Sequence, residues 1–226
     1  NIFAADLADS LECLKSDLTM NLYPDSDSHR LRVAMGNYLG LNPENIVAGN
    51  GSSEMIELIM KSFIDKGDVV LSFVPTFNMY DRYCRIYSGQ FVGLASGENF
   101  SGDMEALLKK AKAVQPKIIF LCNPNNPTGY YFSKPTVKGL LAGVCCPVVV
   151  DEAYAEFAPD SMVSEINMHE NLIVLRTWSK ALGLAAIRLG CLVADRQIIS
   201  IINRVRAPYN LNTLSQYIGD RVLDNK

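Results

Sequence analysis

Runs of apolar residues alternate with segments of helical period along most of this chain. A short, nearly continuous apolar run predicts a buried strand, whereas apolar positions three and four residues apart predict one face of a helix. We therefore expect strands at residues 46–48, 69–73, 91–94, 117–122, 147–150, 172–175 and 190–194. We expect helices at residues 1–20, 29–39, 55–63, 104–113, 134–144 and 213–223. Strands that alternate with helices predict an α/β fold, with a mainly parallel mixed sheet sandwiched by helices.

The boundaries of the first two helices follow from turn chemistry. The first helix carries leucines at helical spacing, namely Leu7, Leu11, Leu14 and Leu18. It should end before Pro24, because proline lacks a backbone donor and restricts the residue before it. The side chain of Ser26, Asp27 or Ser28 is expected to cap the second helix, which should end at Gly40.

Length, composition and charge narrow the class of protein. With 226 residues, of which 49% are hydrophobic and 20% charged, the chain can bury a sizeable core. Its formal net charge is -3 and it has no basic run, so nothing draws it to nucleic acid or to an anionic membrane. No apolar run approaches the roughly 18 residues of a membrane helix, and neither end resembles a signal peptide. We therefore expect a globular, cytoplasmic protein.

The cysteines and histidines form no recognisable disulfide or metal pattern. The 6 cysteines include no C-x-x-C pair, and most of them lie in apolar runs. We expect buried free thiols in a reducing cytosol. His29 and His169 lack the spacing of metal ligands, which argues against a zinc site.

Lys180 lies at the junction between the expected strand 172–175 and a loop. Two hydroxyls precede it, at Thr177 and Ser179, and Arg188 follows it. Hydroxyls and a guanidinium suit a phosphate, which accepts charge-assisted hydrogen bonds. An aldehyde cofactor with a phosphate tail needs a lysine amine beside that phosphate, because the amine can condense to a Schiff base. The pattern favours pyridoxal phosphate, although Lys180 taken alone also fits an ordinary solvated lysine.

A second anion site is indicated by the turn Gly49-Asn50-Gly51-Ser52-Ser53-Glu54. The turn opens the expected helix 55–63, so its backbone amides and hydroxyls would face a ligand at the positive end of the helix dipole. No Gly-Lys-Ser/Thr follows, which excludes a Walker loop. For Ser52 and Ser53, a plain capped turn is an equally good interpretation.

Three more candidates, Phe77, Asn126 and Asp151, each come shortly after one of the expected strands. A mainly parallel sheet binds ligands at the carboxyl ends of its strands. We therefore expect these residues to meet Lys180 in one pocket. Taken singly, Asp151 and Asn126 also fit turn residues, and Phe77 fits a core aromatic.

Together these motifs resemble a known family. They are Tyr23-Pro24-Asp25, Gly49 to Glu54, Pro75-Thr76-Phe77-Asn78-Met79-Tyr80, Asn123 to Gly129, Asp151-Glu152-Ala153-Tyr154, and Ser179-Lys180-Ala181 with Arg188. In this order, across nearly the whole chain, they resemble the fold-type I aminotransferases that use pyridoxal phosphate. The resemblance is strongest to the histidinol-phosphate aminotransferases. It is more specific for the superfamily than for the substrate.

The resemblance implies a role for each residue around the cofactor ring. Lys180 would form the Schiff base and, once released, would move the proton between the substrate carbon and the cofactor. Asp151 would pair with the pyridinium nitrogen, because a nearby carboxylate keeps the ring protonated. Asn126 and Tyr154 would hydrogen-bond the ring oxygen. Phe77 would stack on the ring, where other members often carry tyrosine.

The resemblance also implies a phosphate site and a partner subunit. The phosphate ligands would be Ser52, Ser53, Thr177, Ser179 and Arg188. Tyr23 would reach the phosphate of the neighbouring subunit, so a homodimer is part of the expectation. The substrates would be a small amino donor and a 2-oxo acid.

Three features depart from the family pattern. Ala186 stands near Arg188 where the family usually has glycine, and its methyl group could crowd the site slightly. Only Asn1 is left as a trace of the family's N-terminal Asn-Glu-Asn-Pro pattern. The sequence ends at Lys226, before the family's small domain, so we expect a fragment. Its expected parts are an N-terminal arm at 1–28, a cofactor-binding large domain at 29–212, and at 213–226 the start of the helix that leads to the small domain.

The leading hypothesis is an aminotransferase of histidine biosynthesis that moves an amino group between histidinol phosphate and 2-oxoglutarate. A decarboxylase of the same superfamily acting on threonine phosphate would share these cofactor motifs. A third interpretation is a truncated chain that binds the cofactor without turnover. Product analysis with each substrate separates the two enzymes. Cofactor absorbance without transamination, rescued by adding the missing C-terminal portion, would favour the third interpretation.

Overall fold

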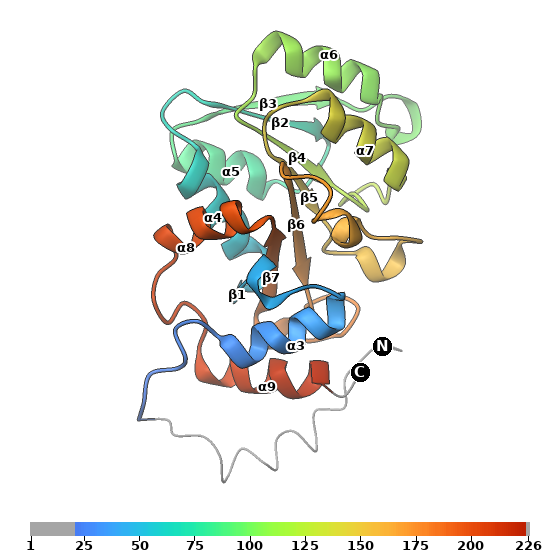
Figure 1. Cartoon of the computed structure of the whole chain (residues 1–226). Coiled ribbons are helices and arrows are strands. Elements are labelled where there is room, and N and C mark those ends of the chain that lie inside the picture. Colours follow the sequence, from blue (N-terminus) through green and yellow to red (C-terminus); the bar gives the residue numbers. More distant parts are fainter. Residues whose placement is uncertain (1–20, 225–226) are drawn as a thin grey trace.

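The structure, a computed structural model, describes residues 21–224 (Figure 1). The helix expected at residues 1–20, including Asn1 and Cys13, lies outside this range. Seven strands form one sheet in the order β1-β7-β6-β5-β4-β2-β3. They are β1 (Ile46–Asn50), β2 (Val69–Val74), β3 (Gln90–Ala95), β4 (Ile118–Cys122), β5 (Val148–Asp151), β6 (Leu172–Thr177) and β7 (Leu189–Ala194). Only β7 pairs antiparallel, with β1 and β6, so the expected mainly parallel mixed sheet is confirmed.

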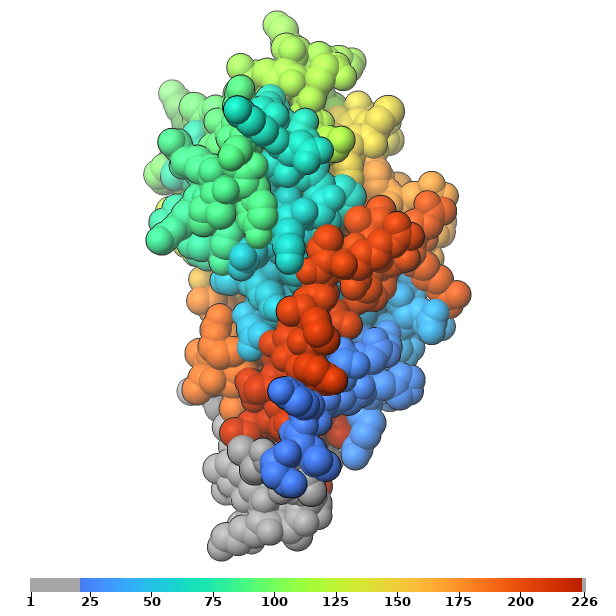
Figure 2. Space-filling model, turned by 90° about the vertical axis from the view of Figure 1, so that its left-hand side faces the viewer, coloured from blue at the N-terminus to red at the C-terminus, as the bar shows by residue number. Residues whose placement is uncertain are grey.

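Helices cover both faces of the sheet (Figure 1). They are α3 (His29–Leu39), α4 (Gly51–Phe63), α5 (Met79–Ile86), α6 (Met104–Val114), α7 (Lys134–Gly143), α8 (Arg196–Val205) and α9 (Thr213–Asp224). One buried cluster packs residues of α4, α5 and α8 against the sheet, and this face is seen in Figure 2. The other buried cluster packs α3, α6, α7 and α9 against the opposite face.

The two clusters explain the continuous apolar runs of the sequence. In β5, Val148 and Val150 belong to one cluster, and Val149 between them belongs to the other. Successive side chains of a strand point to opposite faces, so a strand covered on both sides must be apolar throughout.

Two helices, α5 and α8, are not expected from the sequence. In α5 only Tyr80 and Cys84 are buried; their four-residue spacing is helical, but a helix of 8 residues repeats that spacing too few times to stand out in the sequence. In α8 the buried residues are isoleucines, whose β-branched side chains favour strands. The side chain of Asp195 accepts a hydrogen bond from Gln197 N at 2.8 Å, and this N-cap is the signal that would have identified α8.

The cap of α3 differs from the expectation that Ser26, Asp27 or Ser28 provides it. Ser28 stands at the N-cap position, but its side chain makes no capping hydrogen bond. Instead Asp25 Oδ2 accepts from the backbone N–H of His29 at 2.7 Å. This hydrogen bond, the largest cause, lowers the pKa of Asp25, because it favours the ionised carboxylate. Asp25 lies before the first residue of α3, and its negative charge also suits the positive N-terminal end of the helix dipole.

The strand registers bring the ends of several strands to one edge of the sheet. Cys122 at the end of β4 pairs with Asp151 at the end of β5, and Thr177 at the end of β6 pairs with Gly190 near the start of β7. The edge that results is where ligand sites are expected in such sheets.

Candidate active site

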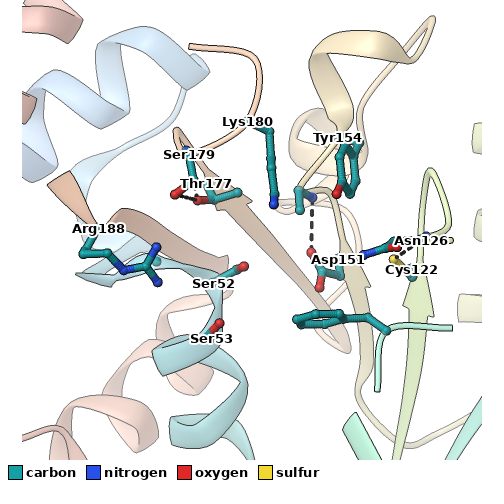
Figure 3. A pocket seen from close by; sticks show the side chains of 13 residues that line it. Ser52, Ser53, Cys122, Asn126, Asp151, Tyr154, Thr177, Ser179, Lys180 and Arg188 are labelled. Carbon is teal, nitrogen blue, oxygen red and sulfur yellow. Dashed lines mark hydrogen bonds between the residues drawn. The ribbon is translucent and has the colours of Figure 1, made fainter. Parts of the chain in front are cut away.

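A pocket opens at this edge of the sheet (Figure 3). Every residue expected from the sequence to contact the cofactor lines this pocket, except Tyr23. The lining consists of Gly51, Ser52, Ser53, Phe77, Cys122, Asn126, Asp151, Ala153, Tyr154, Thr177, Ser179, Lys180 and Arg188. The chain therefore brings together, from the ends of five strands and the start of β7, residues that are up to 137 positions apart, from Gly51 to Arg188.

One half of the pocket is suited to an anion. Figure 3 shows Ser52, Ser53, Thr177, Ser179 and Arg188 gathered on one side. Gly51 begins α4, so the first-turn amides of this helix are directed to the pocket together with the positive end of its dipole. The guanidinium of Arg188 adds a fixed positive charge.

A glycine is required where Arg188 approaches α4. Gly51 has a φ of 74°, in the left-handed region that favours glycine. A Cβ at this position would lie 3.0 Å from Arg188 Nη2. The bare backbone thus lets the guanidinium come close to the helix N-terminus.

The loop that carries Lys180 is fixed by Thr177. The Thr177 hydroxyl lies 3.1 Å from both the Leu189 carbonyl oxygen and the Ser179 hydroxyl. It also accepts a hydrogen bond from the backbone N–H of Ser179 at 3.3 Å. These contacts hold Ser179, and with it Lys180, at the end of β6.

The other half of the pocket is built around the buried carboxylate of Asp151, the last residue of β5, which is only 2% exposed. The Tyr80 hydroxyl donates to Asp151 Oδ2 at 2.7 Å, and Ala153 N donates to Oδ1 at 3.1 Å. Burial raises the pKa of Asp151, while the hydrogen bonds of Tyr80 and Ala153 and the charge of Lys180 act in the opposite direction. A positively charged or protonated group in the pocket could pair with the carboxylate of Asp151.

Lys180 lies between the two halves (Figure 3). Its Nζ is 5.6 Å from the centre of the Tyr154 ring. Tyr154 and Asn126 lie on the Asp151 side, and Asn126 belongs to a loop fixed by its neighbours. Asn123 Nδ2 donates to the Phe132 carbonyl oxygen at 2.9 Å and thereby fixes the start of this loop.

Tyr23 and Ala186 lie apart from the pocket lining. The Tyr23 ring stacks on Tyr209, with 4.6 Å between the ring centres, and 81% of the residue is exposed. Ala186, where the sequence raised a question of crowding, is exposed in the short 3-10 helix Ala185–Ile187.

Sequence reasoning missed contacts that depend on long-range packing. Cys122 lines the pocket, and its Sγ accepts a hydrogen bond from Asn126 N at 3.4 Å. Tyr80 holds Asp151 without lining the pocket. The fourth-residue spacing of Tyr80 and Cys84 could have identified the inner face of α5, but not the partner of the Tyr80 hydroxyl.

Two other kinds of feature are absent from residues 21–224. None of the helices described there is long and apolar enough to cross a membrane. The same residues contain no group of three or more His, Cys, Asp or Glu side chains that could hold a metal ion.

Comparison with known proteins identifies relatives of the whole chain. The family model described as aminotransferase class I and II matches residues 5–226. The histidinol-phosphate aminotransferase of Thermoanaerobacter sp. (strain X514) is 44% identical over 212 residues, which is 94% of this chain and 60% of that protein. The chain thus spans well under two thirds of the length of this relative.

Solved structures have the same fold. The histidinol-phosphate aminotransferase from Sinorhizobium meliloti, in complex with pyridoxal-5'-phosphate, superposes with a TM-score of 0.90 at 24% identity, covering 99% of this chain and 62% of that one. The L-threonine-O-3-phosphate decarboxylase from Porphyromonas gingivalis gives 0.82 at 23% identity, covering 98% and 66%. At these identities the likeness establishes the fold alone.

Proposed function

Because this chain belongs to the class I and II aminotransferase family, we propose that it is the catalytic core of a pyridoxal-phosphate-dependent aminotransferase. The observation that carries the proposal is one pocket in which the Lys180 amine lies between an anion-binding half and the buried Asp151 carboxylate. We further propose histidinol phosphate as amino donor and 2-oxoglutarate as acceptor, which the name of the relative at 44% identity supports. Residues 29–212 would form the cofactor-binding domain.

The side chains of the pocket fit pyridoxal phosphate. The cofactor carries a phosphate at one end and a ring nitrogen that can be protonated at the other. The pocket offers the complementary charges, with Arg188 and the N-terminus of α4 on one side and Asp151 on the other. The apolar face of Phe77 also lines the pocket and suits an aromatic ring.

Each residue would then have a defined task. Ser52, Ser53, Thr177, Ser179 and Arg188 would hold the phosphate. Asp151 would keep a proton on the ring nitrogen, and Asn126 and Tyr154 would hydrogen-bond the ring oxygen. When bound, the cofactor supplies an aldehyde that takes up the amino group and a ring that accepts electrons from the substrate carbon. Lys180 Nζ would remove the proton from that substrate carbon and would then deliver it to the cofactor.

A substrate test distinguishes the candidate functions. The purified chain with pyridoxal phosphate is incubated with histidinol phosphate and 2-oxoglutarate, and separately with threonine phosphate. We expect glutamate from the first mixture and no carbon dioxide from the second. Lys180→Ala should abolish the product, whereas the matched variant Lys134→Ala, whose lysine lies at the start of α7 and bonds Ser164, should retain it.

The other outcomes each have a meaning. Carbon dioxide from threonine phosphate would replace the transaminase by a decarboxylase, whose fold this chain shares. Cofactor binding without either product would support a binding chain without turnover. Product formation that survives Lys180→Ala would contradict the site itself.

We also propose that the working form is a cytoplasmic homodimer in which Tyr23 contacts the phosphate bound by the partner subunit. The exposure of the stacked pair Tyr23 and Tyr209 supports this proposal, because two large rings are turned to the surface together. The free thiols of Cys84, Cys122 and Cys191 are compatible with a reducing compartment.

A further inference from the structure

Tyr80 is a fully buried tyrosine that lies behind the pocket, on α5. Its hydroxyl donates to Asp151 Oδ2 at 2.7 Å. A buried hydroxyl needs a partner, and a hydrogen bond to a charged group is stronger than one between neutral groups. The strongest polar contact of Tyr80 is thus made to the acid at the base of the pocket.

The ring of Tyr80 contacts a second group of the site. It meets the ring of Phe77 edge to face, at 5.8 Å between centres and an angle of 84°. On another side it stacks on Phe120, a buried residue of β4, at 4.6 Å. Phe120 is part of the central sheet and cannot move easily, so Tyr80 joins Asp151 and Phe77 to a rigid support.

We propose that Tyr80 is a positioning residue that orients the Asp151 carboxylate, keeps it ionised and fixes Phe77 at the edge of the pocket. The proposal rests on the proposed function, because it takes Asp151 as the partner of the cofactor's ring nitrogen. Tyr80 does not line the pocket, so it acts through Asp151 and Phe77.

The direction of the hydrogen bond follows from the surroundings. Burial and the neighbouring charge of Asp151 hold the pKa of Tyr80 well above its usual range, so the phenol keeps its proton and donates it. With Oδ2 bound by Tyr80 and Oδ1 by Ala153 N, the plane of the carboxylate is set by two donors. A third donor entering from the pocket can approach only along the remaining lone pairs.

Four groups from different elements face Asp151. They are Tyr80 from α5, Cys122 from β4, the backbone N–H of Ala153 and the amine of Lys180 beyond β6. The Cys122 thiol stays neutral because burial raises its pKa to about 12. Of these groups, Tyr80 is the side chain that donates directly to the carboxylate. Its removal should therefore make Asp151 more basic.

The first test is made on the cofactor-free protein. The pKa of Asp151 is followed by carbon-13 NMR of its carboxyl group in the wild type, in Tyr80→Phe and in Tyr83→Phe. Tyr83 lies on the same helix and is a matched control for the loss of a phenol. We expect the pKa to rise in Tyr80→Phe and to stay the same in Tyr83→Phe. Equal values in all three proteins would overturn the proposal.

The second test measures pyridoxal phosphate binding by fluorescence. Tyr80→Phe should weaken binding by about tenfold or more, as expected for a hydrogen bond to a charged group. In an Asp151→Asn background the same change should have a much smaller effect, because its target charge is gone. Equal losses in both backgrounds would mean a general packing role and would contradict the proposal.

Two further observations keep the outcomes distinct. If the wild type binds no pyridoxal phosphate, the proposed function fails, while the NMR titration still tests the link between Tyr80 and Asp151. If Tyr80→Phe does not fold, the hydroxyl proton of Tyr80 is observed directly in the wild type. We expect it to exchange slowly and to shift as Asp151 titrates, and a signal insensitive to that titration would refute the link.

Discussion

At the scale of single residues, Asp151 combines a functional advantage with a cost in stability. Its pKa in the folded protein is raised by burial above the usual 3.8, so the folded state binds this proton more tightly than the unfolded state. Stability contributed by such a group falls as the pH rises from its unfolded pKa through its folded pKa. Under the proposed function, this cost accompanies a charge that would pair with the cofactor's ring nitrogen.

Replacing the acid tests this balance. In Asp151→Asn the group cannot ionise, so the difference in unfolding free energy between variant and wild type should shift in favour of the variant as the pH rises. Urea unfolding of both cofactor-free proteins at several pH values, from below 3.8 up to pH 8, measures this difference. The same variant should bind pyridoxal phosphate more weakly. A difference that is independent of pH would contradict the raised pKa.

Arg176 is a second residue whose charge matters, on the face of the sheet opposite Tyr80. Its Nη2 lies 2.6 Å from Glu156 Oε1 and its Nη1 3.4 Å from Glu152 Oε2. Burial is the main cause that raises the pKa of Glu152, and Arg176 opposes it. Arg176→Met would leave the buried Glu152 and the partly buried Glu156 without their cation, at a cost of about 3 to 5 kcal/mol in unfolding free energy.

The loss in Arg176→Met should also depend on pH. Without the arginine the pKa of Glu152 rises further, so the variant loses more stability at pH 8 than at pH 5. Denaturant unfolding at the two pH values measures this, with Arg85→Met as control, because Arg85 pairs with Asp81 on an exposed helix surface. A loss as small as that of the control would show that the buried network is dispensable.

The sequence predicts the residues of the site that lie at strand ends, and misses buried residues such as Tyr80 that contact the site from the protein interior. Asp151 directly follows an apolar run and Lys180 comes a few residues after another, so their position on the edge of the sheet can be inferred locally. The contact between Tyr80 and Asp151 joins residues 71 positions apart in sequence. No local pattern encodes that contact, because it depends on how α5 packs on the sheet.

At the scale of elements, the pocket depends on the close approach of α4 to β7, the strand next to the edge strand β1. Gly190 in β7 lies under the start of this helix, where an added Cβ would be 2.5 Å from Gly51 C and 2.7 Å from Ser52 N. These are backbone atoms, so the helix itself would have to move. The start of α4 can thus lie this close to the sheet because Gly190 has no side chain.

Gly190→Ala should therefore displace the N-terminus of α4. We expect an unfolding free energy lower by about 1 to 3 kcal/mol, as for other overpacked cores, together with weaker binding of pyridoxal phosphate. Gly139→Ala is the control, because no atom lies within 4 Å of its added Cβ. Calorimetry and fluorescence titration measure both effects. Normal binding by Gly190→Ala would contradict the role of this contact.

The elements themselves were predictable where one signal dominated. The apolar runs located all seven strands, and the ends differ by only one or two residues. The helices α5 and α8 were missed, although both are amphipathic, because α5 is short and the isoleucines of α8 favour strands. The cap of α3 was assigned to a neighbour of Asp25, because turn residues adjacent in sequence compete for the same role.

At the scale of the whole molecule, β7 runs antiparallel to β6. The residues that precede β7 therefore lie at the same edge of the sheet as the residues that end β6. Arg188 precedes β7 and Thr177 ends β6, yet both line the pocket. The sequence predicts a mainly parallel sheet, but the strand order is a property of the assembled fold. The homodimer, too, follows from no local pattern and rests on the resemblance.

Tyr23 provides the test of the proposed assembly. If Tyr23 contacts the phosphate of the partner subunit, Tyr23→Phe should leave a dimer by sedimentation but bind pyridoxal phosphate about tenfold more weakly, through loss of a hydrogen bond to a charged group. Tyr209→Phe changes the other ring of the same stack and should bind normally. Equal affinities for the two variants, or a monomeric wild type, would contradict the proposal.

The central claim is that the amine of Lys180 receives the cofactor. It is tested most directly by incubating the chain with pyridoxal phosphate, reducing with borohydride and locating the added mass in proteolytic peptides. We expect one labelled lysine, Lys180, and loss of that label in Lys180→Ala. Label on another lysine, or none at all, would contradict it.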